Sequence, residues 1–343
     1  MPQTSLRRLL ALLICAAMLA VSACANTEEN QPEAAEVTTA GVFPVTVDHQ
    51  FGSTTVERQP VRVVSVGLTE QDVLLQLGIV PVGVTDWYGD QPDAVWPWAR
   101  DLLGEAKPTV LTNTDGFQFE KIAALQPDLI IGTNAGITQA DYDKLSKLAP
   151  TVTNPKGSEQ YFAPWDEQTV QIAKAVGQEA KGAELVAQTK AAYAKVKADH
   201  PQFVGKTATF SQGAPYDGNL YVYPDGLNTE FLTELGFTIT PGLEKHQQKA
   251  GEQALISAEL VEVIDADVIV FATESQQNFD ELQKWSTIKN LDAVREKRAV
   301  YTDTTLAGAI YFMTPLSLDY VLAELTPMLE AATEGKAPQS YPG

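Results

Sequence analysis

The chain has 343 residues, 44% of them hydrophobic, and a formal net charge of −20 at pH 7. So acidic a protein repels nucleic acid and anionic lipid headgroups, which excludes roles that depend on binding either of them. Its only two cysteines, Cys15 and Cys24, lie within the first 24 residues, so disulfides do not cross-link the fold.

The N-terminus has the pattern of a secretory lipoprotein signal. Arg7 and Arg8 precede an apolar run over residues 9–19, which is short for a membrane span but has the length of a signal-peptide core. The "VSAC" that follows resembles a bacterial lipobox, in which the cysteine is lipidated and becomes the first residue of the mature protein. The pattern predicts a signal peptide over 1–23 and a lipid anchor on Cys24.

Residues 24–43 are polar and acidic and lack apolar periodicity, which predicts a flexible tether. Loss of the signal peptide removes two arginines and no acidic residue. The mature chain then has 22 basic against 44 acidic residues and a net charge of about −22. The roughly 300 remaining residues suffice for one large or two medium hydrophobic cores.

Two pairs of segments repeat the same layout, with one member of each pair in each half of the chain. Residues 62–86 and 218–242 both read as strand, polar turn, helix and glycine stop. Residues 120–131 and 259–271 both begin with glutamate, reach aspartate eight residues later and continue into an all-apolar strand. That last pattern is typical of a parallel sheet covered on both faces. We predict two α/β lobes, related by internal duplication or by convergent layout.

The longest predicted helix lies between the repeats. Residues 178–199 are rich in Ala, Lys, Glu and Gln, with apolar positions at helical spacing. Asp166 is expected to cap the shorter helix before it, Gly177 to separate the two helices, and His200-Pro201 to end the second. About 22 helical residues span roughly 33 Å, enough to reach from one lobe to the other. The predicted domains are an N-terminal lobe at 44–177, an interdomain helix at 178–200, a C-terminal lobe at 201–334 and a tail at 335–343.

The motifs of common enzymes are missing from the sequence: G-x-S-x-G, the P-loop, G-x-G-x-x-G after a strand, and H-E-x-x-H. The three histidines, His49, His200 and His246, differ in context, and each is interpreted as a surface residue. We therefore expect no enzymatic activity, no cofactor and no metal bound directly by the protein.

The loops expected at the carboxyl ends of the strands are rich in Trp, Tyr, Asn, Gln and Thr. This composition suits a wide cleft that binds an organic ligand through aromatic surface and neutral hydrogen bonds. For Trp96 and Phe312, packing in the core is an equally good interpretation. The candidate ligand-binding residues are Thr69, Trp87, Tyr88, Arg100, Asn134, Gln212, Tyr216, Tyr221, Glu274 and Tyr311.

Taken in order, the lipobox, residues 62–86, "FQFEKIAALQPDLIIGTNAG", one long helix and "LISAELVEVIDADVIVFATES" resemble a known family. It is the iron-siderophore and vitamin B12 type of ABC-transporter substrate-binding lipoprotein, and the resemblance covers about residues 44–332. It implies the class III periplasmic-binding-protein fold, an α/β fold of two Rossmann-like lobes with central sheets joined by a single long interdomain helix. It also implies a monomer that binds its ligand between the lobes and works with an ABC permease and its ATPase.

The resemblance further implies that one glutamate in each lobe docks onto arginines of the permease. The matching positions are Glu120 and Glu259, which the internal repeat also places in register. Two exposed carboxylates can report lobe spacing to a basic receptor through charge-assisted hydrogen bonds. An acid at a helix N-terminus also complements the helix dipole, and both roles are compatible.

The charged residues in the predicted cleft loops limit the kind of ligand that can bind. These loops contain no lysine and one arginine, Arg100, so a strongly anionic ferric catecholate is disfavoured. A neutral or cationic ferric hydroxamate siderophore fits better, and its own coordination of iron leaves the protein no ligand to supply. If Arg100 points into the cleft, ferric citrate becomes competitive. Haem with an axial Tyr88, Tyr216 or Tyr221, and cobalamin, stay open.

The expected function is therefore capture of a ferric siderophore at the extracytoplasmic face of the cell membrane, with Cys24 as the only membrane contact. The outer face of a single membrane and the periplasm of a two-membrane cell both remain open. The competing class is a cell-envelope enzyme or adhesion lipoprotein, for which no catalytic pattern is found.

Overall fold

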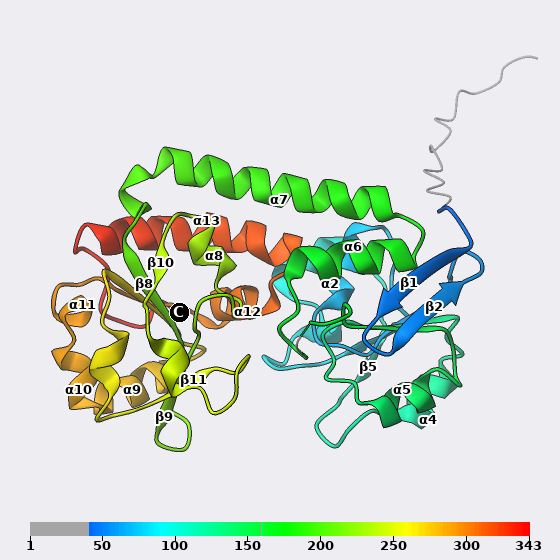
Figure 1. The fold of residues 1–343 in the computed structure, drawn as a ribbon, viewed down its shortest axis with the longest axis horizontal. Coiled ribbons are helices and arrows are strands. Elements are labelled where there is room, and N and C mark those ends of the chain that lie inside the picture. The colour runs from blue at the N-terminus through cyan, green and yellow to red at the C-terminus, as the bar shows by residue number, and fades with distance from the viewer. Residues whose placement is uncertain (1–40, 159) are drawn as a thin grey trace, which may run out of the picture. The chain divides into compact units, whose positions relative to one another are not determined.

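Two β-sheets, one in each half of the chain, organise the structure (Figure 1). The computed structural model describes residues 41–158 and 160–343. The predicted signal peptide, Cys24 and most of the predicted tether lie outside the described residues. Val42 is already attached to the folded part, because its N–H donates to the carbonyl of Gly177 at 3.1 Å.

The N-terminal lobe contains a five-stranded parallel sheet in the order β5-β4-β3-β6-β7. Its central strands are short and fully buried because helices cover both faces, as the all-apolar pattern of residues 129–131 predicts. The strands are β3 (Val63–Ser65), β4 (Gly83–Thr85), β5 (Thr109–Leu111), β6 (Leu129–Gly132) and β7 (Thr151–Thr153). The helices are α2 (Glu70–Gln76), η1 (Pro92–Ala94), η2 (Pro97–Ala99), α3 (Arg100–Leu103), α4 (Phe119–Ala124), α5 (Gln139–Leu145) and α6 (Trp165–Ala175).

A hairpin that the sequence analysis did not predict precedes this sheet. It consists of β1 (Val45–His49) and β2 (Gly52–Val56), paired antiparallel. His49 is fully buried at the end of β1, where its ring nitrogens pair with the hydroxyls of Thr54 at 3.0 Å and Thr153 at 3.1 Å. The interpretation of His49 as a surface residue is therefore wrong: this histidine fastens the hairpin to β7.

The C-terminal lobe contains a six-stranded mixed sheet, ordered β11-β9-β8-β12-β13 with β10 beside β8. Strands β8, β10, β12 and β13 run parallel, whereas β9 is antiparallel to β8 and β11. The strands are β8 (Thr207–Gln212), β9 (Asn219–Val222), β10 (Thr238–Ile239), β11 (Ala254–Ser257), β12 (Val268–Ala272) and β13 (Ala299–Tyr301). The helices are η3 (Pro201–Phe203), α8 (Glu230–Thr233), η4 (Leu243–His246), η5 (Val261–Ile264), α9 (Gln276–Lys284), α10 (Ser286–Asn290), α11 (Asp292–Arg295), α12 (Thr304–Phe312) and α13 (Pro315–Thr333).

The predicted repeat is confirmed in one pair of segments and corrected in the other. Asp128 and Asp267 occupy equivalent positions in the two lobes. The carboxylate of Asp128 accepts a hydrogen bond from the N–H of Arg62, just before β3, and that of Asp267 accepts one from the N–H of Thr207, the first residue of β8, each at 2.8 Å. The predicted equivalence of residues 62–86 and 218–242 is wrong for the first strand of each segment, because β3 and β9 are not equivalent strands. The parallel partner of β12 is β8, and the antiparallel β9 is an additional strand that only resembles β3 in sequence.

One long helix, α7 (Glu179–Asp199), runs past both lobes (Figure 1). Gly177, with φ of 75°, ends the preceding turn and lets the chain reverse into it. The expectation that Asp166 caps α6 is wrong, because Pro164 is the N-cap and Asp166 instead pairs with Lys190 of α7 at 2.6 Å. None of the helices in the described part of the chain is long and apolar enough to cross a membrane.

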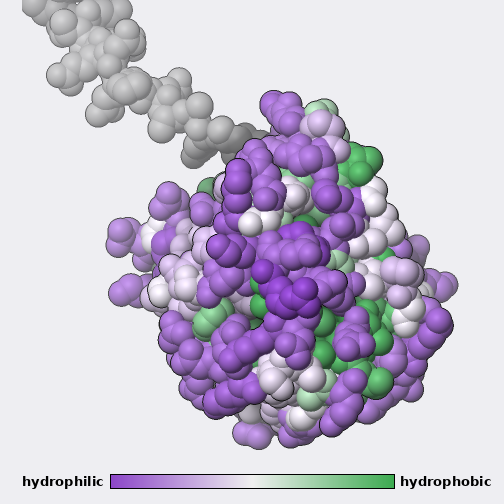
Figure 2. Space-filling model, turned by 90° about the vertical axis from the view of Figure 1, so that its left-hand side faces the viewer, coloured by the Kyte–Doolittle hydropathy of each residue, from purple (hydrophilic) through white to green (hydrophobic). Residues whose placement is uncertain are grey.

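The last residues pack on the C-terminal lobe. The N–H of Ala337 donates to the carbonyl of Lys297 at 3.0 Å, and the side chain of Gln339 donates to the carbonyl of Ala299 at 3.1 Å. The outer face of the C-terminal lobe is mostly hydrophilic, in keeping with the acidic composition, with some hydrophobic residues gathered on one side (Figure 2).

The two lobes also meet directly, beneath α7. Asp72 of α2 is fully buried, and one of its oxygens accepts hydrogen bonds from Trp98 Nε1 at 2.7 Å and from Thr314 Oγ1 at 2.7 Å. Thr314 is the N-cap of α13, the last helix of the C-terminal lobe. Trp96 and Phe312 are buried beside this contact, which confirms their interpretation as packing residues. The interlobe junction is therefore a buried polar contact surrounded by aromatic rings.

We expect the stability of the protein to depend on pH through Asp72. Burial raises the pKa of Asp72 to about 7, against the opposing hydrogen bonds from Thr314 and Trp98. A raised pKa means that folding favours the protonated acid. The contribution of Asp72 to the free energy of unfolding is therefore complete below about pH 4 and is lost as the pH rises through 7. The loss amounts to about 4 kcal/mol at most.

In urea unfolding between pH 4 and 8, Asp72→Asn should flatten this decline, since an amide oxygen can accept both hydrogen bonds without charge. Asp72→Ala, the control, should lower the free energy of unfolding by about 1–3 kcal/mol at low pH because both donors lose their acceptor. Equal pH dependence in the native protein and Asp72→Asn would contradict this assignment.

Candidate functional site

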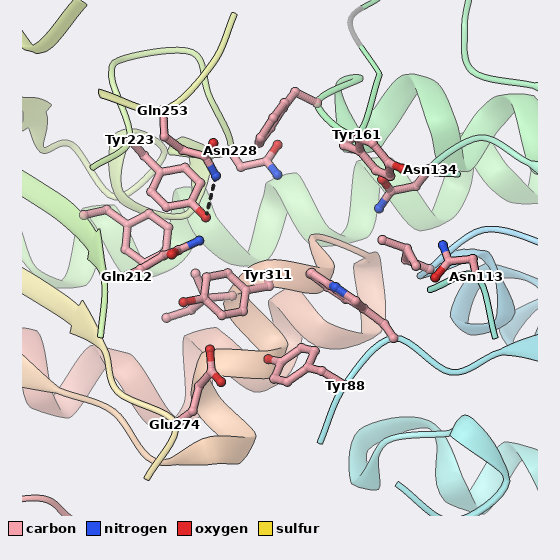
Figure 3. A pocket seen from close by; sticks show the side chains of 15 residues that line it. Tyr88, Asn113, Asn134, Tyr161, Gln212, Tyr223, Asn228, Gln253, Glu274 and Tyr311 are labelled. Carbon is pink, nitrogen blue, oxygen red and sulfur yellow. Dashed lines mark hydrogen bonds between the residues drawn. The ribbon is translucent and has the colours of Figure 1, made fainter. Parts of the chain in front are cut away.

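A cavity of about 660 Å³ lies between the two sheets, within the size range of small-molecule sites (Figure 3). Its walls come from both lobes, and most lining residues follow the carboxyl ends of strands. Leu68 follows β3, Asn134 follows β6, Gln212 ends β8 and Glu274 follows β12. In each sheet these are the two central strands, where the connections diverge to opposite sides and ligands of open α/β sheets bind.

Aromatic rings form the largest part of the lining. Seven of the 15 lining side chains are aromatic. Trp87, Tyr88 and Tyr311 make one group, with ring centroids 4.9 Å apart for Trp87–Tyr88 and 6.0 Å apart for Tyr88–Tyr311. The ring of Phe210 packs against Tyr223, with centroids 4.5 Å apart, and against Tyr311, with centroids 6.2 Å apart. Such walls provide extensive contact to an organic ligand with little loss of side-chain entropy.

Neutral amides supply the main polar contacts. Five of the lining residues are amides, contributed by both lobes: Asn113, Asn134, Gln212, Asn228 and Gln253. The amide nitrogen of Asn134 donates to Thr69 Oγ1 at 3.1 Å, while its oxygen is buried without a partner. Gln253 donates to the Tyr223 hydroxyl at 3.4 Å (Figure 3). The cavity therefore offers both donors and acceptors without formal charge.

Glu274 is the one lining residue with an ionisable acidic or basic side chain of the Asp, Glu, Lys, Arg or His type. Burial raises the pKa of Glu274 above its usual range. In the described part of the chain, no group of three or more His, Cys, Asp or Glu side chains is arranged to hold a metal ion.

On the side of the N-terminal lobe, the floor of the cavity is held by the buried carboxylate of Glu70. Glu70 is 1% exposed, and it accepts hydrogen bonds from Asn134 N at 2.6 Å, Thr69 N at 3.1 Å and the Thr133 hydroxyl at 3.3 Å. Burial raises the pKa of Glu70, and these hydrogen bonds oppose the rise. A Cβ at Gly67 would lie 1.9 Å from Glu70 Oε1, so glycine leaves room for the carboxylate. Glu70 thereby ties the loop after β3 to the loop after β6.

A close approach of backbone does the same in the C-terminal lobe. Gly213 follows β8, and a Cβ there would lie 2.2 Å from the carbonyl oxygen of Ala272 at the end of β12. Only glycine permits this contact, which lies where β8 and β12 end side by side and supply Gln212 and Glu274 to the cavity wall.

Six of the ten residues predicted from the sequence line the cavity: Trp87, Tyr88, Asn134, Gln212, Glu274 and Tyr311. Thr69 lies just beneath it, buried, as the hydrogen-bond acceptor for Asn134. Whether these side chains contact a ligand stays a prediction.

The other three predicted residues do not line the cavity. Arg100 donates to Asp93 at 3.2 Å and to the carbonyls of Pro92 and Val95, so its charge is used within its own loop. Tyr216 is 64% exposed in the β8–β9 turn and packs on Tyr221, with ring centroids 6.3 Å apart. These placements correct the expectation for Arg100, Tyr216 and Tyr221.

Nine lining residues were not among the predicted candidates, most of them because they lie in segments that read as strand core or as featureless loop. They are Leu68, Asn113, Tyr161, Phe162, Phe210, Tyr223, Asn228, Gln253 and Ile310. Tyr223 illustrates the difficulty: its N–H donates to the Phe210 carbonyl at 3.0 Å, which turns its ring toward the cavity just beyond β9. The Pro-Asp-Gly that follows Tyr223 was the one available signal that the strand ends there.

The family model for periplasmic binding proteins matches residues 63–306, which include both central sheets and most of the cavity lining. The chain belongs to the periplasmic binding protein family. This confirms the resemblance to the iron-siderophore type of ABC-transporter substrate-binding protein and the class III fold expected from it. Members of the family are binding proteins rather than enzymes.

Individual relatives agree with this assignment. A Bacillus subtilis protein named probable siderophore-binding lipoprotein YfiY is 31% identical over 311 residues, covering 86% of this chain and 90% of the relative. The solved periplasmic solute binding protein of Mycobacterium smegmatis is 43% identical, with a TM-score of 0.78 and coverage of 84% and 98%. The structure of Streptococcus pneumoniae PiaA in complex with ferrichrome is 28% identical, with a TM-score of 0.74 and coverage of 85% and 99%.

The two glutamates that the periplasmic binding protein resemblance singles out are both exposed. Glu120 lies in the first turn of α4. Glu259 lies in a turn before η5, so the α-helix expected there is only a 3₁₀-helix. Hydrogen bonds from its own N–H and from the Ser257 hydroxyl lower the pKa of Glu259. Glu259 therefore presents a charged carboxylate to solvent.

We expect Glu70 to hold the cavity floor in place. Glu70→Ala should lower the free energy of unfolding by about 1–3 kcal/mol, because buried donors lose their acceptor. It should also speed amide hydrogen exchange in the peptides that contain Leu68 and Asn134. Thr133→Val, which removes a single hydrogen bond, is the control and should have the smaller effect. Unchanged exchange in Glu70→Ala would show that the floor does not depend on this carboxylate.

Proposed function

We propose that this chain captures a ferric siderophore in the interlobe cavity and delivers it to an ABC permease for iron uptake. The siderophore is of the hydroxamate type and is neutral or positively charged. The observation that carries the proposal is the lining itself: aromatic rings and neutral amides, one carboxylate and no basic side chain.

Electrostatics supports the choice of siderophore. A ferric catecholate or ferric citrate carries several negative charges, each of which needs a cation or donors when desolvated. Arg100, the residue that could have supplied a cation, is bonded to Asp93 and to backbone carbonyls of its own loop. The chain as a whole is strongly acidic. A ligand without net negative charge avoids this repulsion.

The iron-siderophore relatives support the proposal at the level of ligand class. Their names record a siderophore for YfiY and ferrichrome, a ferric hydroxamate, for PiaA. In a ferric siderophore the iron is already coordinated, which agrees with a site built from amides and rings.

Haem is less well supported. Of the three tyrosines considered as axial ligands, only Tyr88 lies on the cavity wall, and burial raises the pKa of Tyr88, which opposes the phenolate form.

Anchoring and docking complete the proposal. A lipid on Cys24 would keep the receptor at the extracytoplasmic face of the membrane, and the acidic tether would let it reach the permease. Glu120 and Glu259, exposed on separate lobes, would pair with basic residues of the permease.

Quenching of tryptophan fluorescence tests the ligand class. The full-length chain, purified in detergent, is titrated with a ferrioxamine, a ferric catecholate, ferric citrate and haemin. We expect saturable quenching by the ferrioxamine at sub-micromolar concentration, because Trp87 is 38% exposed on the cavity wall. Trp87→Phe, which keeps a ring, should reduce the quenching amplitude. Preference for the catecholate or citrate would contradict the charge argument, and no binding of any iron complex would contradict the iron assignment.

Uptake by cells tests the docking residues. Glu120→Ala combined with Glu259→Ala should abolish siderophore-dependent iron uptake while leaving ligand affinity unchanged, because both residues are exposed and neither lines the cavity. Glu105→Ala combined with Glu330→Ala, which removes one exposed acid from each lobe, is the charge-matched control. Full uptake by the first variant would rule out docking through this pair.

A further inference from the structure

The wall of the cavity around Glu274 differs from the rest of the lining. Glu274 follows β12, and its backbone is held on both sides: its N–H donates to Asn278 Oδ1 at 3.1 Å, and its carbonyl accepts from the Thr304 hydroxyl. The side chain is left to face the cavity (Figure 3). No hydrogen bond or ion pair to its carboxylate occurs within residues 41–158 and 160–343. The carboxylate is thus half-buried and uncompensated.

Three tyrosines lie near this carboxylate. Figure 3 shows the hydroxyl of Tyr88 and the carboxylate of Glu274 directed toward one another, with Tyr311 beside them and Tyr223 beyond. The hydroxyls of Tyr88 and Tyr311 are buried without a hydrogen-bond partner. Burial first, and the nearby charge of Glu274 in addition, raise the pKa of both. Both hydroxyls therefore stay protonated and neutral.

We propose that this part of the cavity is a cation subsite, in which Glu274 pairs with an ammonium group of the siderophore between the rings of Tyr88, Tyr311 and Trp87. The inference rests on the proposed function and narrows its ligand class to ferric hydroxamates that carry a free amine.

The geometry suits an organic cation. The centroids of the Trp87, Tyr88 and Tyr311 rings lie between 4.9 and 6.1 Å from one another, so a small cationic group near one ring is within reach of its neighbours. The negative faces of aromatic rings attract ammonium groups, and more strongly when water is excluded. A carboxylate beside the rings adds a charge-assisted hydrogen bond.

The uncompensated charge also gives a reason for the selectivity. Burial raises the pKa of Glu274, which means that the charged form of the carboxylate is disfavoured unless a cation compensates it. A bound ammonium would remove that penalty, whereas an acylated, neutral amine would leave it in place. The ligand's free amine is therefore recognised by a carboxylate that no side chain of the described residues compensates.

The first test needs no variant. The full-length chain in detergent is titrated with three ferric hydroxamates: ferrioxamine B, which ends in a primary ammonium, its N-acetyl derivative, and ferrichrome. We expect ferrioxamine B to bind roughly tenfold or more tightly than the N-acetyl derivative, the range of a hydrogen bond between charged groups. Equal affinity for the two forms would overturn the cation subsite while leaving the proposed function standing. No binding of any of the three would overturn both.

The second test uses Glu274→Gln, which keeps the shape and removes the charge. Its ratio of affinities for ferrioxamine B and the N-acetyl derivative should fall to about one, with folding checked by thermal unfolding. Glu244→Gln, an exposed residue of η4 away from the cavity lining, makes the same charge change and should keep the full ratio. Retention of the preference by Glu274→Gln, or its loss in Glu244→Gln, would show that Glu274 is not the counter-ion.

Discussion

The structure depends on one buried contact between the lobes, in which the Asp72 carboxylate accepts hydrogen bonds from Trp98 and from Thr314. Thr314 opens α13, while Asp72 belongs to α2, so a single oxygen connects the first helix of one lobe to the last helix of the other. These two hydrogen bonds and the aromatic rings packed around them oppose separation of the two surfaces. Together with α7, the contact determines how the two sheets face one another across the cavity.

That fixed arrangement explains the chemistry of the cavity. The carboxyl ends of the central strands of both sheets point at the same space. In the C-terminal lobe, the close backbone approach at Gly213 holds the ends of β8 and β12 together. In the N-terminal lobe, Glu70 accepts hydrogen bonds from the loops after β3 and β6 and holds those loops together. The resulting walls are rings and neutral amides, with Glu274 as the one charge. In a protein of net charge −20, such walls favour ligands that bring no further negative charge.

Most of the fold could be predicted from the sequence, because it depends on local patterns of apolar and polar residues. The all-apolar strands at 129–131 and 268–271 are buried and pair in parallel with both of their neighbours, and the long helical pattern corresponds to α7. The antiparallel β9 was misread, because strand direction within a sheet depends on its neighbours and not on its own side chains. His49 was misplaced for a similar reason: its burial depends on Thr153, a hundred residues away.

The sequence by itself determined the class of protein, the two lobes, the linking helix and the polar aromatic character of the loops. Only the tertiary structure decided which loop residues face the cavity. Arg100 and Tyr223 show why. Both lie in segments that connect strands, but Arg100 is bonded within its own segment, whereas the backbone of Tyr223 is paired with Phe210. Side-chain direction at such positions depends on contacts between distant segments, and these form only when the chain is folded.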